Sequence, residues 1–179
     1  MAKDMNSTSL IIPCRLSYAH IWEKDSNGKY SAALIIDKDD KLIAKIEKAI
    51  EAAKIVGKSK LANNKGVIPK NLKTPLRDAD EEEVDDEAYI GKMWMNASTS
   101  SNNFKRVDRR ANPIIDQTEL YSGCYCNVAI NFYAFSVEGN KGIACGLNGI
   151  QKVRDGEPLS GINVQFESLD DEDDDDMFS

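Results

Sequence analysis

The chain has 179 residues, of which 41% are hydrophobic and 30% are charged, and it carries one histidine. This length suits one domain of ordinary size with a hydrophobic core and leaves little room for a second. No apolar run approaches the roughly 18 residues of a membrane span, and the apolar stretch near the N-terminus is too short for a signal peptide. The composition excludes a helical membrane protein, and we expect a cytoplasmic one.

The formal net charge of −7 is unevenly distributed. The segment from Glu167 to the end holds 8 of the 30 acidic residues and no basic one, so residues 1–166 carry 22 acidic against 23 basic side chains, a net charge of +1. A second run, from Asp78 to Glu87, holds another 8 acidic residues. Outside both runs the balance is 23 basic against 14 acidic side chains, or +9. The bulk of the protein is therefore basic, with two acidic inserts.

The first elements in chain order are a hairpin and a helix. Residues at period two predict a strand over 10–22, which places Tyr18, His20 and Trp22 on the same face as Leu16, and we expect Trp22 to be part of the core. The turn "DSNGKY" and the run "KYSAALIID" predict the returning strand. Residues 39–57 then show helical periodicity, with Asp39 as N-cap and Gly57 as the stop. The polar segment 58–86 is expected to be a long exposed loop.

The second half of the chain is richer in strand signals. They are expected over 89–98 and, after a basic loop at 102–113, over 124–137 and 143–153. Glycines in the last strand suit a curved barrel strand. The pattern predicts a mainly β fold: a five-stranded OB-type barrel with one amphipathic helix and long loops. We place this domain at 1–166 and expect the acidic tail 167–179 to be disordered.

Two readings of the four cysteines remain open. Cys124 and Cys126 share one face of an apolar strand, as buried structural thiols would. A zinc site built from cysteines with His20 is the less favoured alternative. We therefore expect reduced core thiols, no metal and no cofactor.

Aromatic residues on the strand 124–137 suggest a binding surface. Tyr125, Tyr133 and Phe135 alternate with the apolar core positions, beside two asparagines. Exposed rings and amides are what unstacked bases use for stacking and edge contacts. The alternative is that these rings pack under the helix or a loop. The candidate stacking residues are Tyr125, Tyr133, Phe135, Trp94, Phe104 and Tyr121.

Basic residues near these rings could contact a phosphate backbone. Each neutralised phosphate of a single strand would then add about 0.7 to the slope of log K against log salt. The alternative is an ordinary solvated face. The candidate backbone contacts are Arg15, Lys105, Arg106, Arg109, Arg110, Lys141, Lys152 and Arg154.

The tail "SLDDEDDDDMFS" mimics a phosphate chain with an apolar tip. Tethered to a basic groove, it would compete for that groove at a high effective concentration. It could also dock on a partner, while the plain alternative is a solubility tail. The candidate partner contacts are Asp173, Asp174, Asp175, Asp176 and Phe178.

The internal acidic run raises two further alternatives. Asp78, Asp80 and Glu82 could hold magnesium in a nuclease, although metal nucleases need carboxylates fixed on rigid elements. A DNA-mimicking or scaffold protein that binds a basic partner is the other alternative. We find no phosphate-binding glycine motif and no catalytic triad, and expect a protein that is not an enzyme.

Several stretches resemble the single-stranded DNA-binding proteins of tailed bacteriophages, most specifically "GNKGIACGLNGIQKVRDGEPL", with "GKYSAALIIDK" and "ELYSGCYCNVAINFYAF". The resemblance implies an OB-fold that coats single-stranded DNA during phage replication and recombination, without catalysis, in the cytoplasm of an infected bacterial host. It also implies that the acidic tail contacts replication and recombination proteins and guards the binding cleft. In similar proteins a phenylalanine commonly ends the chain, whereas here Ser179 follows Phe178. We expect a monomer or a homodimer.

Overall fold

The computed structural model describes residues 7–70 and 72–159. The predicted domain boundary at residue 166 and the acidic tail lie outside this part of the chain. No helix of the described residues is long and apolar enough to cross a membrane. The elements in chain order are β1 (Ser9–His20), β2 (Tyr30–Asp37), α1 (Asp40–Val56), α2 (Lys58–Leu61), β3 (Arg77–Asp78), the 3-10 turn η1 (Glu87–Tyr89), β4 (Lys92–Thr99), β5 (Lys105–Val107), the 3-10 turn η2 (Gln117–Glu119), β6 (Tyr125–Val137) and β7 (Asn140–Arg154).

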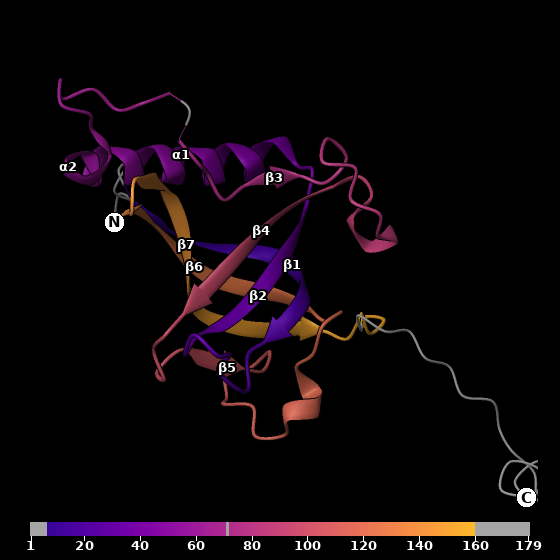
Figure 1. The fold of residues 1–179 in the computed structure, drawn as a ribbon. Helices are drawn as coiled ribbons and strands as arrows, with labels where there is room; N and C mark the ends of the chain where they lie inside the picture. The colour runs from indigo at the N-terminus through magenta and orange to yellow at the C-terminus, as the bar shows by residue number, and fades with distance from the viewer. Residues whose placement is uncertain (1–6, 71, 160–179) are drawn as a thin grey trace, which may run out of the picture.

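Five strands close into a barrel (Figure 1). The sheet order β3-β4-β2-β1-β6-β7-β5 closes where β4 pairs in parallel with β7, at Ser98 and Gly146. The neighbouring pairs β1–β2, β2–β4, β1–β6 and β6–β7 are antiparallel. The predicted five-stranded OB-type barrel is therefore confirmed, with the four-residue α2 as an additional helix.

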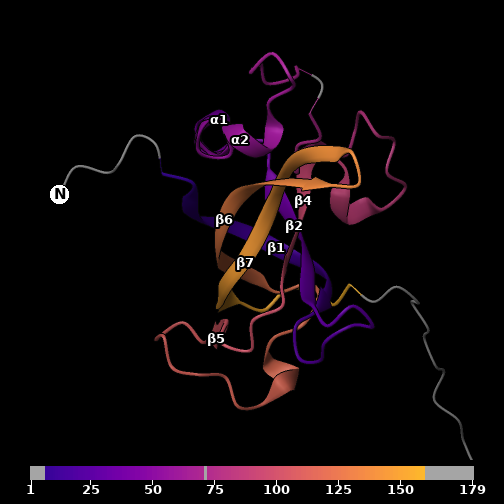
Figure 2. The ribbon, with the colours of Figure 1, turned by 60° about the vertical axis from the view of Figure 1, so that its left-hand side comes forward.

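Helix α1 lies across one end of the barrel (Figures 1 and 2). Its N-cap is Asp39, as predicted, whose Oδ1 accepts a hydrogen bond from the Leu42 amide at 3.0 Å. Gly57 ends the helix against β6, where an added Cβ would lie 2.2 Å from the Cβ of Ala134. This contact needs glycine because no larger residue fits between helix and strand.

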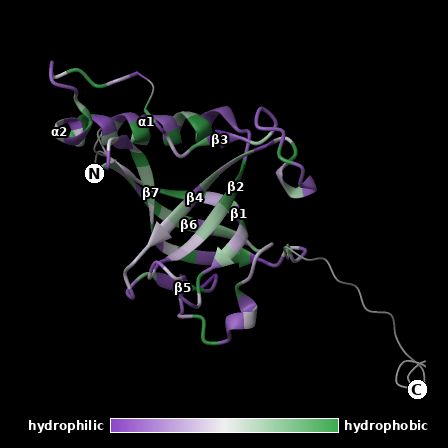
Figure 3. Cartoon of the chain, viewed as in Figure 1, coloured by the Kyte–Doolittle hydropathy of each residue, from purple (hydrophilic) through white to green (hydrophobic). Residues whose placement is uncertain are grey.

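The barrel interior holds one hydrophobic core that includes Leu16, Leu34, Met95 and Phe132. Hydrophobic residues concentrate in the barrel strands and α1, whereas the connecting loops are mostly hydrophilic (Figure 3). The four cysteines are free and buried, in agreement with the core-thiol reading. Burial raises the pKa of Cys126 and of Cys145 to about 12, so both thiols are neutral near pH 7.

Two predictions about β1 and the segment after α1 were wrong. The pairing of β1 with β2 shifts register between Ser17 and His20, and Tyr18 adopts a φ of 45° with its side chain 59% exposed. A β-bulge of this kind re-aims side chains, so Tyr18 points outward and not into the core. The segment 58–86 is not wholly exposed either, because it contains α2 and β3 and buries Ala79.

The basic loop predicted over 102–113 also contains a strand. Residues 105–107 form β5, which pairs in parallel with β7 from Gly149 to Gln151. Because β5 holds this loop against the barrel, several of its side chains are fixed in place and do not form a solvated arm.

Candidate nucleic-acid interface

The six predicted stacking rings lie in four different places. Tyr121 and Tyr125 lie where β1, β6 and β7 meet, and Trp94 lies on the outer face of β4. Tyr133 and Phe135 lie toward the other end of β6, eight residues from Tyr125 or more, which is about 26 Å along a strand at 3.3 Å per residue. Phe104 packs in the core. Strand alternation therefore predicted the outward face but not the distances along it.

Phe104 and Arg106 belong to the framework of the fold. The Phe104 side chain is 5% exposed, and its ring centroid lies 4.9 Å from that of Tyr30. The Arg106 guanidinium carbon lies 4.4 Å from the Phe104 ring centroid, and its Nη1 donates to the Ile21 carbonyl at 2.6 Å. Neither side chain is free for a base or a phosphate in this conformation, so both predictions are corrected. The pair joins β5 to the β1–β2 hairpin.

Three predicted site residues lie near the C-terminal end of β6 and the start of β7. Phe135 covers Gly142 of β7, where an added Cβ would lie 3.1 Å from the ring carbon Cε1. Lys141 donates from Nζ to the Ala62 carbonyl at 3.4 Å, which holds it at this end as well. Tyr133 is 42% exposed. These three predicted residues are therefore separated from the cluster around Tyr125.

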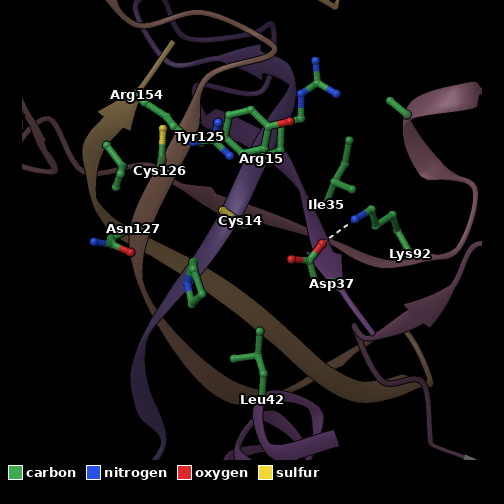
Figure 4. Close-up of a pocket in the computed structure, with 13 residues that line it drawn as sticks. Cys14, Arg15, Ile35, Asp37, Leu42, Lys92, Tyr125, Cys126, Asn127 and Arg154 are labelled. Atoms are coloured by element: carbon green, nitrogen blue, oxygen red, sulfur yellow. Dashed lines mark hydrogen bonds and ion pairs between the residues drawn. The ribbon is translucent and has the colours of Figure 1, made fainter. Parts of the chain in front are cut away.

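Tyr125 holds two arginines at its ring. Its backbone pairs with Arg15 on β1 and with Arg154 on β7, so one guanidinium approaches from each neighbouring strand. The guanidinium carbons lie 5.3 Å and 4.0 Å from the ring centroid, within cation–π distance (Figure 4). The ring thus fixes two cations on the outside of the barrel, and base stacking on it requires an arginine to move aside.

A groove runs over the outer face of β1 beside this cluster, and we call it the β1 groove. It consists of three adjoining hollows of about 360, 640 and 500 Å³. The first two share Arg15 and Ala88, and the last two share Tyr18, Asp85 and Asp86. The first hollow is flanked by the ion pair between Lys92 and Asp37 (Figure 4). The groove therefore has basic and aromatic groups at one end and carboxylates along its side.

The remaining predicted cations differ in how they are engaged. Lys152 forms an ion pair of 2.5 Å with Asp155, and its Nζ lies 5.5 Å from the Tyr121 ring. Burial is the largest influence on the pKa of Lys152 and lowers it, but the hydrogen bond to Asp155 and the neighbouring Cys124, Asp155 and Tyr121 together raise it by more, so the pKa lies above its ordinary value. Arg109 donates to the Val153 carbonyl at 3.0 Å, next to Arg154. The exposed Lys105 and Arg110 lie on β5 and in the turn after it.

The chain leaves β7 through the β1 groove. Arg15 donates from Nη2 to the Glu157 carbonyl at 2.7 Å, and Tyr121 donates to the Gly156 carbonyl at 2.9 Å. The Leu159 amide donates to the Ser122 carbonyl at 2.8 Å. An added Cβ at Gly123 would lie 2.2 Å from the Glu157 oxygen, which shows how closely the segment is packed. The predicted tail contacts Asp173, Asp174, Asp175, Asp176 and Phe178 lie outside the described residues.

The internal acidic run does not form a metal site. Asp78 and Asp80 each lie 2.9 Å from Nζ of Lys38, and Glu82 lies 2.9 Å from Nη1 of Arg77. Hydrogen bonds lower the pKa of both aspartates, from Lys38 at Asp78 and from the Gly91 amide and Lys38 at Asp80. Within residues 7–70 and 72–159 no cluster of three metal-ligating side chains is suited to an ion. The nuclease alternative finds no support, because protein cations neutralise the carboxylates it needs.

Sequence reasoning missed Tyr18, Lys38 and Arg77. The spacing of Tyr18 continues the period of β1 and predicts the face of Leu16, and nothing in the residue pattern marks the bulge. Lys38 lies 40 residues before Asp78 and reaches the acidic run only in space, whereas Arg77 directly precedes the run but shows its pairing with Glu82 only in the structure. Opposite charges in distant segments predict an ion pair only when the pairing of the strands that carry them is known.

Comparison with known proteins gives one family. The family model described as Enterobacter phage Enc34, ssDNA-binding protein, matches residues 8–178. Protein p50 of Acyrthosiphon pisum secondary endosymbiont phage 1 is 38% identical over 98 residues, which are 54% of this chain and 51% of that protein. The match therefore spans about half the length of this curated relative.

Solved structures of phage proteins share the fold. The single-stranded DNA-binding protein from bacteriophage Enc34 superposes with a TM-score of 0.70 at 21% identity, covering 92% of this chain and 94% of that chain. Its complex with ssDNA gives a TM-score of 0.68 at 20% identity, with 89% and 97% covered. The single-stranded DNA-binding protein gp2.5 of bacteriophage T7 gives 0.60 at 15% identity, with 93% and 100% covered. At these identities the likeness concerns the fold alone.

Proposed function

Because the chain belongs to the family of the Enterobacter phage Enc34 ssDNA-binding protein, we propose that it binds single-stranded DNA in the β1 groove, largely independently of sequence. It is a binding protein and not an enzyme. The observation that carries the proposal is the arrangement of Arg15 and Arg154 around the Tyr125 ring at the mouth of the groove. Guanidiniums held in this way present donors to phosphates while the ring limits their motion.

The groove combines the two groups that single-strand binding needs. Arg15 and Arg154 supply positive charge at one end, and the exposed Tyr18 supplies a ring further along. Bases can stack on a ring only when their faces are unpaired, so a duplex gains the charge contacts but not the stacking. We infer a preference for single strands over duplex DNA from this difference.

The acidic tail is proposed to compete with DNA for the groove. Support comes from residues 156–159, which lie along it, with the Glu157 carbonyl on Arg15 where a phosphate oxygen would bind. A tail that continues from this point has a high effective concentration at the same cations. Removing residues 167–179 should therefore tighten binding to DNA.

We further propose that the protein acts in phage DNA replication and recombination, in the cytoplasm of an infected bacterium, as a monomer or homodimer. The tail acids and Phe178 would recruit replication and recombination proteins, with the acids steering the ring to a basic rim. Family membership supports this role. Affinity capture of replication proteins from infected cells should succeed with the full chain and fail without residues 167–179.

Fluorescence anisotropy with labelled oligo-dT tests the binding proposal. The full chain should bind oligo-dT in a salt-dependent manner, resist competition by duplex, and bind more tightly after deletion of 167–179. Arg154→Gln should weaken binding, whereas Lys48→Gln on the exposed side of α1 should not. If neither the full chain nor the truncated one binds, the proposal fails and the DNA-mimic alternative takes its place.

A further inference from the structure

The outer face of β2 and β4 is covered by the acidic segment. In OB-folds the face of the second and third barrel strands, here β2 and β4, binds oligonucleotides. In this chain Ile35 on that face is buried together with Ala79 and Tyr89, and Trp94 packs against them. The segment 78–89 therefore lies where a nucleic acid would be expected.

Carboxylates of this segment bind two cationic side chains and an indole N–H that could otherwise contact DNA. Lys38 Nζ is held at 2.9 Å by both Asp78 and Asp80. Glu82 accepts hydrogen bonds of 2.9 Å from Nη1 of Arg77 and from the indole Nε1 of Trp94. The Arg77 guanidinium carbon lies 5.4 Å from the Trp94 ring centroid. These carboxylates stand in for phosphate oxygens beside an aromatic ring.

The covered face continues the β1 groove. Its third hollow, of about 500 Å³, is lined by Tyr18, Trp94 and Asn96 together with Asp85 and Asp86. Tyr18 reaches this hollow because of the bulge in β1, at a φ of 45° that costs energy for a tyrosine. Strain of this kind collects at binding sites. A strand of DNA that passes Arg15 would meet Tyr18 next and Trp94 after it.

We propose that the β2–β4 face is a second subsite for single-stranded DNA, masked by the acidic segment. Lys38 and Arg77 bind phosphates there, Tyr18 and Trp94 stack bases, and Asp78, Asp80 and Glu82 are displaced by the incoming strand. This inference rests on the proposed binding of DNA in the β1 groove. It gives the internal acidic run a role separate from that of the tail, which acts at Arg15.

The attachment of the segment suits displacement. Its ends are anchored by the buried Ala79 and Tyr89, whereas Asp80 and Glu82 between them are exposed and bind through surface ion pairs. Surface ion pairs contribute little to stability and weaken with salt. The side chains of Asp78, Asp80 and Glu82 can therefore rotate away from Lys38 and Arg77 while Ala79, Val84 and Tyr89 stay packed.

The test compares two triple variants of the full chain by anisotropy with oligo-dT. Asp78→Asn/Asp80→Asn/Glu82→Gln keeps the shape of each side chain but frees Lys38 and Arg77. The control, Glu47→Gln/Glu51→Gln/Glu138→Gln, removes the same charge from exposed positions on α1 and in the β6–β7 turn. Both proteins must first show the circular dichroism spectrum and unfolding midpoint of the parent chain.

The masking account predicts tighter binding in the first variant, by about tenfold at low salt, because three exposed ion pairs need not be exchanged. It also predicts that the slope of log K against log salt becomes steeper by about 1.4, since each of the two freed cations adds about 0.7 to that slope. The control should tighten binding far less and leave the slope unchanged. Adding Trp94→Leu to the first variant should remove most of its gain.

Two other results would overturn the inference. If the parent chain binds oligo-dT but the two triple variants behave alike, the β2–β4 face is not a masked subsite and the proposed function still stands. If the first variant gains affinity and keeps it with Trp94→Leu, the effect is one of net charge only. Absence of binding by every protein, including the parent, would instead contradict the proposed function itself.

Discussion

Replacing both arginines at the Tyr125 ring, by Arg15→Gln/Arg154→Gln, should flatten the salt dependence of DNA binding. Within the described residues Arg15 is hydrogen-bonded only to the carbonyls of Gly123 and Glu157, and neither arginine forms an ion pair there. Both charges are therefore available to phosphates. At about 0.7 per neutralised phosphate, the slope of log K against log salt should fall by about 1.4, and a fourfold rise in salt should cost the parent about sevenfold more affinity than the variant.

The assay is an anisotropy titration with oligo-dT between about 50 and 200 mM salt, the range over which such slopes are read. Lys152→Gln is the matched comparison. Lys152 is already paired with Asp155 at 2.5 Å, so its removal should change the slope by less than that of either arginine. Equal slopes for the parent and the double variant would refute the reasoning, because the arginines would then not contact phosphates.

Three further predictions concern single positions. Tyr18→Leu should weaken oligo-dT binding severalfold, as loss of one base–aromatic stack does, without lowering the urea midpoint, since the ring is 59% exposed; unchanged affinity would remove Tyr18 from the site. Gly57→Ala should destabilise the fold by about 1–3 kcal/mol in urea unfolding, because its Cβ would lie 2.2 Å from that of Ala134, and Ala134→Gly should restore part of the loss. Burial raises the pKa of Cys126 and Cys145 to about 12 from 9.0, so both thiols stay protonated in the fold where unfolded thiols ionise, and stability should fall as pH rises above about 9. A flat unfolding free energy between pH 8 and pH 11 would contradict the last prediction.

Local patterns predicted the barrel well because its strands obey a simple period. In β6 the residues at even positions, such as Cys126 and Phe132, face the core as alternation requires, and Tyr125 and Tyr133 face outward. The Asp39 cap and the Gly57 stop likewise bound α1 as expected. These features depend on neighbours within a few residues, which the sequence records directly.

The site could be predicted only in part, because it depends on contacts between distant segments. Arg15 and Arg154 were both predicted as phosphate contacts, but their meeting at Tyr125 follows from the strand order, which no local pattern contains. The bulge at Tyr18 interrupts an otherwise regular period, so that residue was placed on the wrong face. Phe104 was placed in a solvated loop because its packing partner, Tyr30, lies far away in the sequence.

The most direct test of the central claim is to map the DNA on the protein by ¹H–¹⁵N NMR of the full chain during titration with oligo-dT. We predict that the largest amide shift changes occur at Arg15, Tyr18, Tyr125 and Arg154, along the β1 groove. Changes confined to the other end of β6, around Tyr133 and Val137, with none in the groove, would contradict the account.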